Sequence, residues 1–197
     1  MSKILIGDFH THMNGNGINN RKSNVDFICK SALELNYNAV FLGCHDYSGS
    51  EFKAYVEDNY DLTAICGAEV TTTAGHILVY NIDLIPRDCW ANNAHPVEAK
   101  YVITKFKDMG CKLVMAHPYK ISKWILDIES FYNVVYSLDG AEIRNYKSFL
   151  RDRVDEFSHI REYEHLKLFS SSDCHPWEGD IMHKDYYTEI ELDWFHK

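Results

Sequence analysis

The chain lacks several features that mark particular classes of protein. Its six cysteines are scattered through 197 residues without a C-x-x-C pair, so a disulfide framework is not indicated. No apolar run approaches the roughly 18 residues that a membrane helix needs, and the N-terminus lacks the shape of a cleavable signal. We therefore expect a cytoplasmic protein without membrane contacts.

Basic residues are also scarce, because 20 Lys and Arg face 29 Asp and Glu and give a formal net charge of -9. Proteins that bind nucleic acid usually carry a basic face, so this balance disfavours nucleic acid and favours a small-molecule substrate. Hydrophobic residues make up 46% of the chain and charged residues 25%, which is ordinary for a globular protein. Because nothing marks a linker, we expect residues 1–197 to form a single domain. The sequence leaves the oligomeric state open.

Short apolar runs alternate with longer amphipathic ones along the chain. KILIGDFH (3–10) and NAVFLGCHD (38–46) predict strands, and SNVDFICKSALELN (23–36) between them has apolar residues at helical spacing. Further strands are predicted at 62–72, 76–82, 111–118, 138–145, 166–175 and 186–192, and further helices at 95–110, 122–136 and 147–164. The pattern indicates an α/β fold with a mainly parallel sheet. Seven or so such units can close into a barrel, and an open doubly wound sheet is the alternative.

Histidines and acids lie where these predicted strands end. The stretch IGDFHTH places Asp8, His10 and His12 at alternate positions, which face one way along an extended strand. The later strand ends carry His45, Glu69, His117, Asp173 and His175, and His76 follows the turn after Glu69. Because the C-terminal ends of parallel barrel strands open on one face, these side chains are predicted to meet there. The remaining histidines are interpreted as surface or helix residues: His95, His159, His165, His183 and His196.

A pocket of imidazoles and carboxylates without clustered thiolates suits Zn, Mn or Fe better than Ca or Mg. The number of candidate ligands indicates more than one ion. Two ions about 3.5 to 4 Å apart can hold a hydroxide between them and stabilise both oxygens of an in-line displacement. Glu69 is the natural bridge, because an ionised carboxylate straight after an apolar strand is costly unless it is paired or metal-bound.

Six segments together resemble the PHP (polymerase and histidinol phosphatase) superfamily of metal-dependent phosphoesterases. In the order of the family, they are DFHTH (8–12), GCHDYSG (43–49), GAEVTTTAGHIL (67–78), AHP (116–118), GAEIRN (140–145) and SSDCH (171–175). The resemblance covers nearly the whole chain. It implies a distorted (β/α)7-type TIM-like barrel that holds two or three divalent metal ions, commonly Mn, Fe or Zn.

The resemblance also implies roles by position. It assigns the first metal site to His10, His12, Glu69 and Asp173, the second to Glu69, His76 and His117, and the third to His45 and His175, with Asp8 orienting a ligand from behind. One ligand position departs from the family pattern. The expected Asp or His falls at Gly17 or Ile18, which have no ligating side chain, so Asn16 or water remains for a third ion. Cys44 stands where the family frequently has an acid.

These features predict a phosphoesterase that hydrolyses small phosphate monoesters with hydroxide bridged by the metal ions. The predicted catalytic residues are Glu69, Asp173, His175 and His45, the last two of which would neutralise phosphate oxygens and assist the leaving group. Arg144 is the first candidate for a substrate contact, ahead of Lys120 and Arg21.

Two alternatives stay open. An amidohydrolase-like C–N hydrolase also carries H-x-H on the first strand of a barrel, but such enzymes typically use a carbamylated lysine where Glu69 stands here. A PHP-type nuclease or accessory domain is the other, and the net charge of -9 counts against it. Neither the substrate nor the metal can be named from the sequence.

Overall fold

The computed structural model describes residues 2–14, 17–91, 95–118, 128–149, 160 and 162–196. Within these residues, one sheet runs in the order β8-β7-β6-β5-β4-β2-β1-β9, and β3 pairs with β2 off this path. The strands are β1 Ile4–Asp8, β2 Ala39–Cys44, β3 Tyr47–Ser48, β4 Thr63–Thr72, β5 Gly75–Tyr80, β6 Lys112–Met115, β7 Gly140–Asn145, β8 Lys167–Ser171 and β9 Thr188–Glu191.

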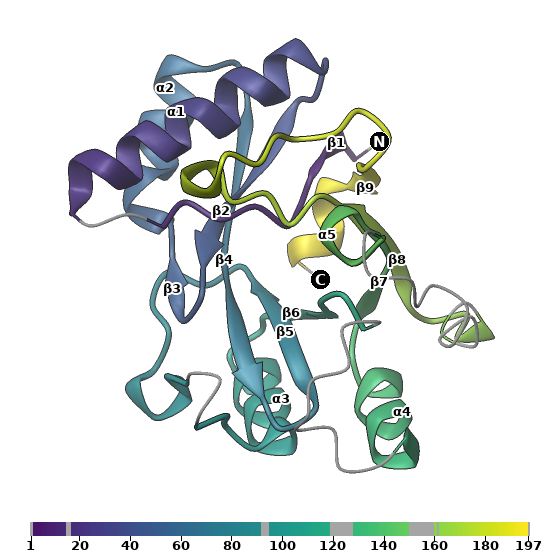
Figure 1. Cartoon of the computed structure of the whole chain (residues 1–197). Helices are drawn as coiled ribbons and strands as arrows, with labels where there is room; N and C mark the ends of the chain where they lie inside the picture. Colours follow the sequence, from purple (N-terminus) through teal and green to yellow (C-terminus); the bar gives the residue numbers. More distant parts are fainter. Residues whose placement is uncertain are drawn as a thin grey trace.

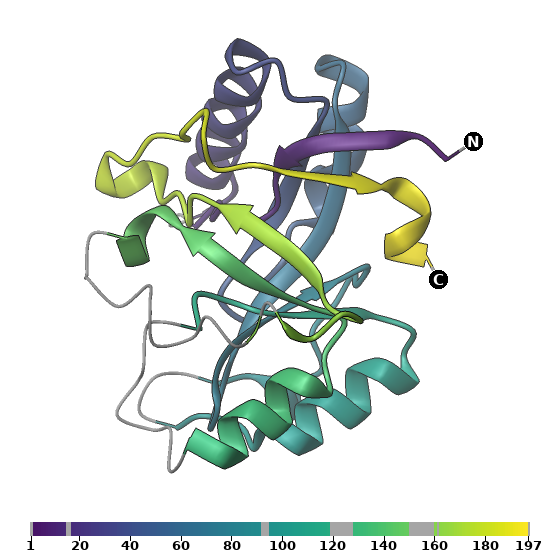
Figure 2. The same ribbon diagram turned by 90° about the vertical axis from the view of Figure 1, so that its right-hand side faces the viewer.

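The sheet curls until its two edges meet, so it forms a nearly closed barrel (Figures 1 and 2). A seam between β8 and β9 completes the ring through one hydroxyl. Ser170 N donates to Thr188 Oγ1 (2.9 Å), and the same hydroxyl donates to Ser170 O (3.1 Å). Beyond the seam, Thr11 and Cys174 form an isolated parallel bridge between the segments that follow β1 and β8. The distorted barrel is thereby confirmed over the open doubly wound sheet.

The sheet is less parallel than the sequence indicates. β1 pairs with β2, β2 with β4, β6 with β7 and β7 with β8 in parallel, whereas β4–β5, β5–β6 and β1–β9 are antiparallel. The reason lies in the connection between β4 and β5. Two residues, Thr73 and Ala74, join these strands before Gly75 takes a φ of 108°, and such a short loop can connect only antiparallel neighbours.

Helices cover opposite sides of the barrel (Figure 1). The α-helices are α1 Ile18–Glu34, α2 Lys53–Asn59, α3 Ala99–Asp108, α4 Ile128–Tyr136 and α5 Tyr146–Phe149, and short 3-10 segments span η1 Ser50–Phe52, η2 Arg87–Cys89, η4 Pro176–Glu178 and η5 Leu192–His196. Parts of the predicted helices at 122–136 and 147–164, namely residues 122–127, 150–159 and 161, lie outside the described residues. No helix in the described ranges is both long and apolar enough to cross a membrane.

The inward face of each strand changes character along its length. In β5, Tyr80 and Leu78 point into an apolar core and His76, two residues further toward the rim, is polar. β4 repeats this with Ile65 in the core and Glu69 at the rim. The core is rich in rings, which include Phe9, Phe41, Tyr80, Phe169 and Phe195. The apolar core thus fills the barrel up to the level at which the histidines and acids begin.

Candidate metal centre

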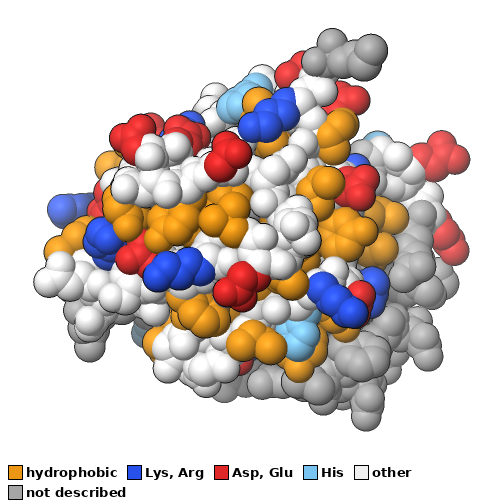
Figure 3. Space-filling model, turned by 90° about the horizontal axis from the view of Figure 1, so that it is seen from above, with side chains coloured by type: hydrophobic (Ala, Val, Ile, Leu, Met, Phe, Trp, Pro, Cys, Tyr) orange, Lys and Arg blue, Asp and Glu red, His pale blue; other side chains and the backbone are white. Residues whose placement is uncertain are grey.

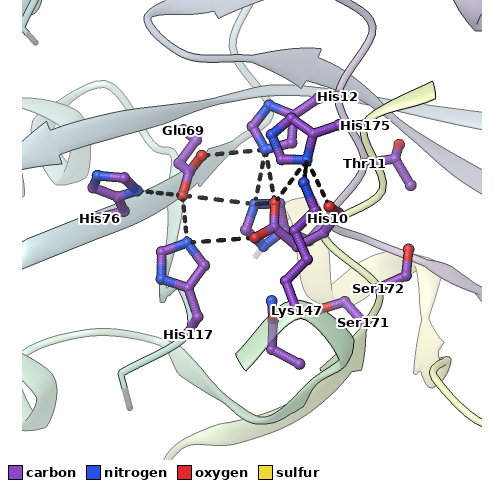
Figure 4. A network of polar contacts seen from close by, with 12 residues as sticks. His10, Thr11, His12, Glu69, His76, His117, Lys147, Ser171, Ser172 and His175 are labelled. Carbon is purple, nitrogen blue, oxygen red and sulfur yellow. Dashed lines mark hydrogen bonds and ion pairs between the residues drawn. The ribbon is translucent and has the colours of Figure 1, made fainter. Parts of the chain in front are cut away.

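The eight predicted ligands meet at one rim of the barrel. They are delivered by the segments after β1 (His10, His12), β2 (His45), β6 (His117) and β8 (Asp173, His175), and by β4 (Glu69) and β5 (His76) themselves. Figure 4 labels His10, His12, Glu69, His76, His117 and His175 among them. Two of them have unusual backbones, because His117 has a φ of 27° and Asp173 a φ of 57°. Left-handed backbone at a residue other than glycine costs energy, and such positions cluster at functional sites.

Four donor groups form a compact first cluster. His10 Nε2 lies 3.1 Å from His12 Nε2 and 3.5 Å from Asp173 Oδ1, and His12 Nε2 lies 3.2 Å from Asp173 Oδ1. Glu69 completes the cluster at 3.6 Å from His10 Nε2 and 3.2 Å from His12 Nε2. Ligands held about 2.0–2.1 Å from a tetrahedral zinc ion lie about 3.3 Å from one another. His10, His12 and Asp173 therefore fit one divalent ion, and Glu69 lies beside them.

Glu69 also faces a second cluster. Its Oε1 lies 2.7 Å from His76 Nδ1 and 2.9 Å from His117 Nε2, while its Oε2 lies 3.3 Å from His45 Nδ1. A carboxylate whose two oxygens each meet different imidazoles is suited to bridge two ions. The geometry is compatible with the bridging role predicted for Glu69, which stays a prediction.

The third predicted site is less complete. His12, His45 and His175 each offer a donor atom within 4.8 Å of the others, and the His12 and His175 rings stack with centroids 4.2 Å apart. Gly17 and Ile18 stand at the start of α1 and supply no donor side chain. Asn16, the remaining candidate, lies outside the described residues.

The electrostatics of the centre suit a cation. Burial raises the pKa of Glu69 and of Asp173, but the surrounding imidazoles outweigh it and hold both values below the usual range. Burial lowers the pKa of His10, yet nearby carboxylates raise it well above 6.5. At His45 and His175 burial prevails and lowers the pKa to about 4, so both are neutral near pH 7. Buried carboxylates and neutral imidazoles are what a divalent ion binds.

A buried glutamate that was not predicted holds two of these ligands. Glu142, in β7, is fully buried and accepts or shares hydrogen bonds at both oxygens. Its Oε1 lies 2.8 Å from His10 Nδ1, and its Oε2 accepts from His117 N (2.5 Å) and Asn145 Nδ2 (3.0 Å). Ser171 Oγ also donates to Oε1. With Nδ1 so engaged, the His10 ring presents Nε2 to the first cluster.

Asp8 acts on the backbone rather than on a ring. It accepts hydrogen bonds from His10 N (3.1 Å) and from the Ser172 backbone and hydroxyl. Burial raises the pKa of Asp8 to about 7 despite these bonds. Asp8 thus contacts the ligand His10 through its backbone and ties together the segments that follow β1 and β8, whereas Glu142 contacts the His10 imidazole. The orienting role of Asp8 stays a prediction.

Within the ranges it describes, the structure does not place the basic residues predicted to contact the substrate in one common position. Arg144 is exposed and its guanidinium lies 4.8 Å from the centroid of the Tyr186 ring, so in the described part of the chain the cation at the centre is another residue. That residue is Lys147, whose Nζ lies 2.6 Å from His175 Nδ1. Lys120 lies outside the described residues.

A cavity of about 700 Å³ adjoins the centre. It is lined by Asn14, Asn20, Arg21, Ser23, Asn24, Cys44, Tyr47 and Trp177. Trp177 connects the cavity with the ligands, because its ring meets the His175 ring edge-on at 4.8 Å between centroids and the His12 ring at 6.4 Å. Arg21 pairs with Glu51 (3.3 Å) and lies over the Tyr47 ring. The lining mixes polar side chains with the rings of Tyr47 and Trp177, and its volume suits a small molecule.

No protein-family model matches the sequence, and no curated protein matches it. Solved structures match the fold. A two-domain protein from Bacteroides vulgatus that contains a predicted PHP-like metal-dependent phosphoesterase aligns with a TM-score of 0.60 and 18% identity over 91% of this chain, which spans 55% of that protein. A protein from Bifidobacterium adolescentis assigned as a metal-dependent phosphoesterase aligns with a TM-score of 0.66 and 14% identity over 91% of this chain and 93% of its own.

Two other structures have the same fold. An amidohydrolase from Chromobacterium violaceum with bound sulfate aligns with a TM-score of 0.62 and 15% identity over 94% of this chain and 92% of its own. Endonuclease Q, in complex with a DNA duplex that carries an abasic lesion, aligns with a TM-score of 0.55 and 16% identity over 88% of this chain and 49% of its own. At these identities the matches establish the PHP-type fold, and the chemistry must be argued from the residues.

Proposed function

We propose that this chain is a PHP-type hydrolase of small phosphate monoesters that works with divalent metal ions, Mn, Fe or Zn, and that residues 1–197 form its single catalytic domain. The observation that carries the proposal is the position of Glu69. One buried carboxylate lies within 3.6 Å of ring nitrogens from five histidines, two of which also meet Asp173 within 3.5 Å. Bound ions would make water nucleophilic at neutral pH and neutralise the charge of the phosphate.

The residues of the centre would have two roles: some would bind the metal ions, and others would contact the phosphate. His10, His12, Glu69 and Asp173 are almost fully buried, so they would hold and orient the ions. His45 and His175 are more open, with side chains 39% and 12% exposed, and would meet the phosphate oxygens. Because burial keeps both rings neutral near pH 7, each can donate one N–H to an oxygen.

The cavity beside the centre would take the rest of the ester. Its asparagines and Ser23 offer both donors and acceptors, and Arg21, which pairs with Glu51, offers further N–H donors. Such a lining favours a leaving group that carries hydroxyl, amide or acidic groups over one that is purely apolar. We infer a polar, water-soluble monoester.

The amidohydrolase alternative has one observation against it. A carbamylated lysine would have to stand between the two ions, where Glu69 stands here. Among the described residues Lys147 is the lysine at the centre, and it contacts His175 rather than Glu69. The nuclease alternative is disfavoured by the net charge of -9 and by the face seen in Figure 3, where Lys and Arg are interspersed with Asp and Glu.

The test is an elemental analysis followed by a substrate panel. Protein purified without chelator is expected to contain Mn, Fe or Zn and to release inorganic phosphate from small monoesters, with a rate that falls on chelation and returns with added Mn²⁺. The same preparation is offered amides, lactones, single-stranded DNA and an abasic duplex. Turnover of one of these without release of phosphate from any monoester would replace the proposal.

A further inference from the structure

The ammonium group of Lys147 sits inside a small cage at the edge of the centre. Its Nζ lies 2.6 Å from His175 Nδ1, 2.7 Å from Asp180 Oδ2 and 2.9 Å from Glu178 Oε2. An ammonium has three hydrogens to donate and no lone pair, so three acceptors satisfy it completely. His175, Glu178 and Asp180 are also a set whose donor atoms lie within 4.8 Å of one another, as the ligands of an ion would. Lys147 therefore stands where a cation could bind.

This contact fixes the proton of the His175 ring. Because Lys147 can only donate, His175 Nδ1 must accept, and the single proton of the neutral imidazole is then on Nε2. Nδ1 is occupied and Nε2 is protonated, so neither nitrogen can ligate a metal ion.

A competing arrangement is also built into the site. The carbonyl oxygen of Asp173 lies 2.8 Å from the same His175 Nδ1 and can only accept. If Nδ1 donated to this carbonyl, Nε2 would be free to bind an ion, which is the usual arrangement of a metal-ligating histidine. The Lys147 contact and the Asp173 contact require opposite protonation of one atom, so they exclude each other.

Two features favour the contact of His175 Nδ1 with Lys147 over its contact with the Asp173 carbonyl. Glu178 and Asp180 hold the ammonium from two further directions. The third site also lacks a ligand, because Gly17 and Ile18 provide no donor where one would be needed. An ion there would have to displace an anchored lysine with an incomplete set of ligands.

The geometry points to Lys147 as a built-in cation that takes the place of a third metal ion and keeps His175 as an N–H donor instead of a ligand. The inference rests on the proposed function for the presence of the two other ions. It assigns the substrate phosphate two neighbours at this edge, the Nε2–H of His175 and the positive charge of Lys147.

The experiment counts ions and locates one proton. Wild-type protein is loaded with excess Zn²⁺, freed of unbound metal and analysed for zinc per chain, and nitrogen-15 spectra of the His175 ring show which nitrogen carries hydrogen. We expect two zinc ions per chain and a proton on Nε2. Lys147→Met removes the donor at similar size, so we expect a third zinc ion and loss of the proton from Nε2.

Lys112→Met is the matched control, because Lys112 has a similar side-chain exposure (19% against 21%) and also pairs with an acid, Asp139. It should behave as the wild type. Lys147→Ala provides a second variant, and thermal melting shows that each variant is folded. Three zinc ions in the wild type, or two in Lys147→Met and Lys147→Ala, would overturn the inference. Absence of zinc from every variant would instead overturn the proposed function.

Discussion

The interior of the barrel and its rim are built from the same strands but are held by different forces. Tyr80 and Leu78 of β5 lie in the apolar core, and His76 of the same strand lies at the rim. The core gains from the removal of apolar surface from water. The rim gathers carboxylates whose burial is costly unless a cation pairs with them. A strand such as β5 therefore packs into the core at one end and presents a candidate metal ligand at the other, so core changes should affect stability without affecting metal binding.

The largest effect is expected in the core. Phe169 is 1% exposed and packs against Phe9, Tyr80 and Trp194, so Phe169→Ala should lower the free energy of unfolding by about 3–5 kcal/mol. Denaturant titration measures this. The metal content of the protein that remains folded should not change. Leu84→Ala is the control, because Leu84 is 73% exposed and its truncation should change stability by less than about 0.5 kcal/mol. Equal losses in the two variants would refute the view of the core as the source of stability.

The complementary change is made at the rim. Glu69→Gln keeps the size of the side chain but removes the charge that faces both clusters, so metal content and phosphatase activity should fall by more than about 100-fold. Elemental analysis and initial rates measure the two losses. In the metal-free protein the surrounding imidazoles pair with Glu69 and hold its pKa below the usual range, so Glu69→Gln should also lower the free energy of unfolding there. Glu189→Gln, an exposed site on β9, is the matched control. Unchanged metal content in Glu69→Gln would contradict the division between core and rim.

A smaller effect on metal binding is expected for Glu142, which contacts the ligands His10 and His117. Glu142→Gln weakens the hold on the His10 ring and on His117 N, and metal affinity should fall by about 10–100-fold. Competition with a chelator of known affinity measures this change. An affinity within twofold of the wild type would show that Glu142 is only a structural residue.

The smallest effect lies away from both regions. Glu98 caps α3 by accepting from Lys100 N (3.0 Å) and Tyr101 N (2.6 Å), so Glu98→Ala should cost about 1 kcal/mol of stability. Thermal melting measures it, and Glu57→Ala on the exposed side of α2 serves as the control. Loss of metal from Glu98→Ala would mean that the rim depends on the helices more than the comparison allows.

The placement of the ligands at strand ends could be predicted from sequence because both signals are local. An apolar run marks a strand, and a histidine or acid marks its end. Helix α2 was missed because KAYVEDN buries only Val56 and shows no apolar stripe. The role of Glu142 depends on His10, which is 132 residues away in the sequence, although a charge inside the apolar run GAEI is the same signal that singled out Glu69.

The outward position of Arg144 has a specific physical cause. Simple alternation along β7 would place Arg144 on the same face as Glu142. The register shifts between these two residues, so Arg144 turns outward and Asn145 turns inward to bond Glu142. A bulge of this kind leaves no trace in the spacing of the sequence, and Lys147 becomes visible as the local cation only once the bulge and the short helix α5 are placed.

The barrel seam gives the proposed ions a mechanical role. The segments after β1 and β8 flank the seam and exchange backbone bonds, from His12 N to Cys174 O and from Asp173 N to His10 O, both 2.9 Å. An ion bound by His10, His12 and Asp173 would link the segment after β1 to the segment after β8. Removal of the metal by a chelator should then raise amide hydrogen exchange first along β9. The metal-bound protein should separate less readily at the seam between β8 and β9, which the Thr188 hydroxyl joins.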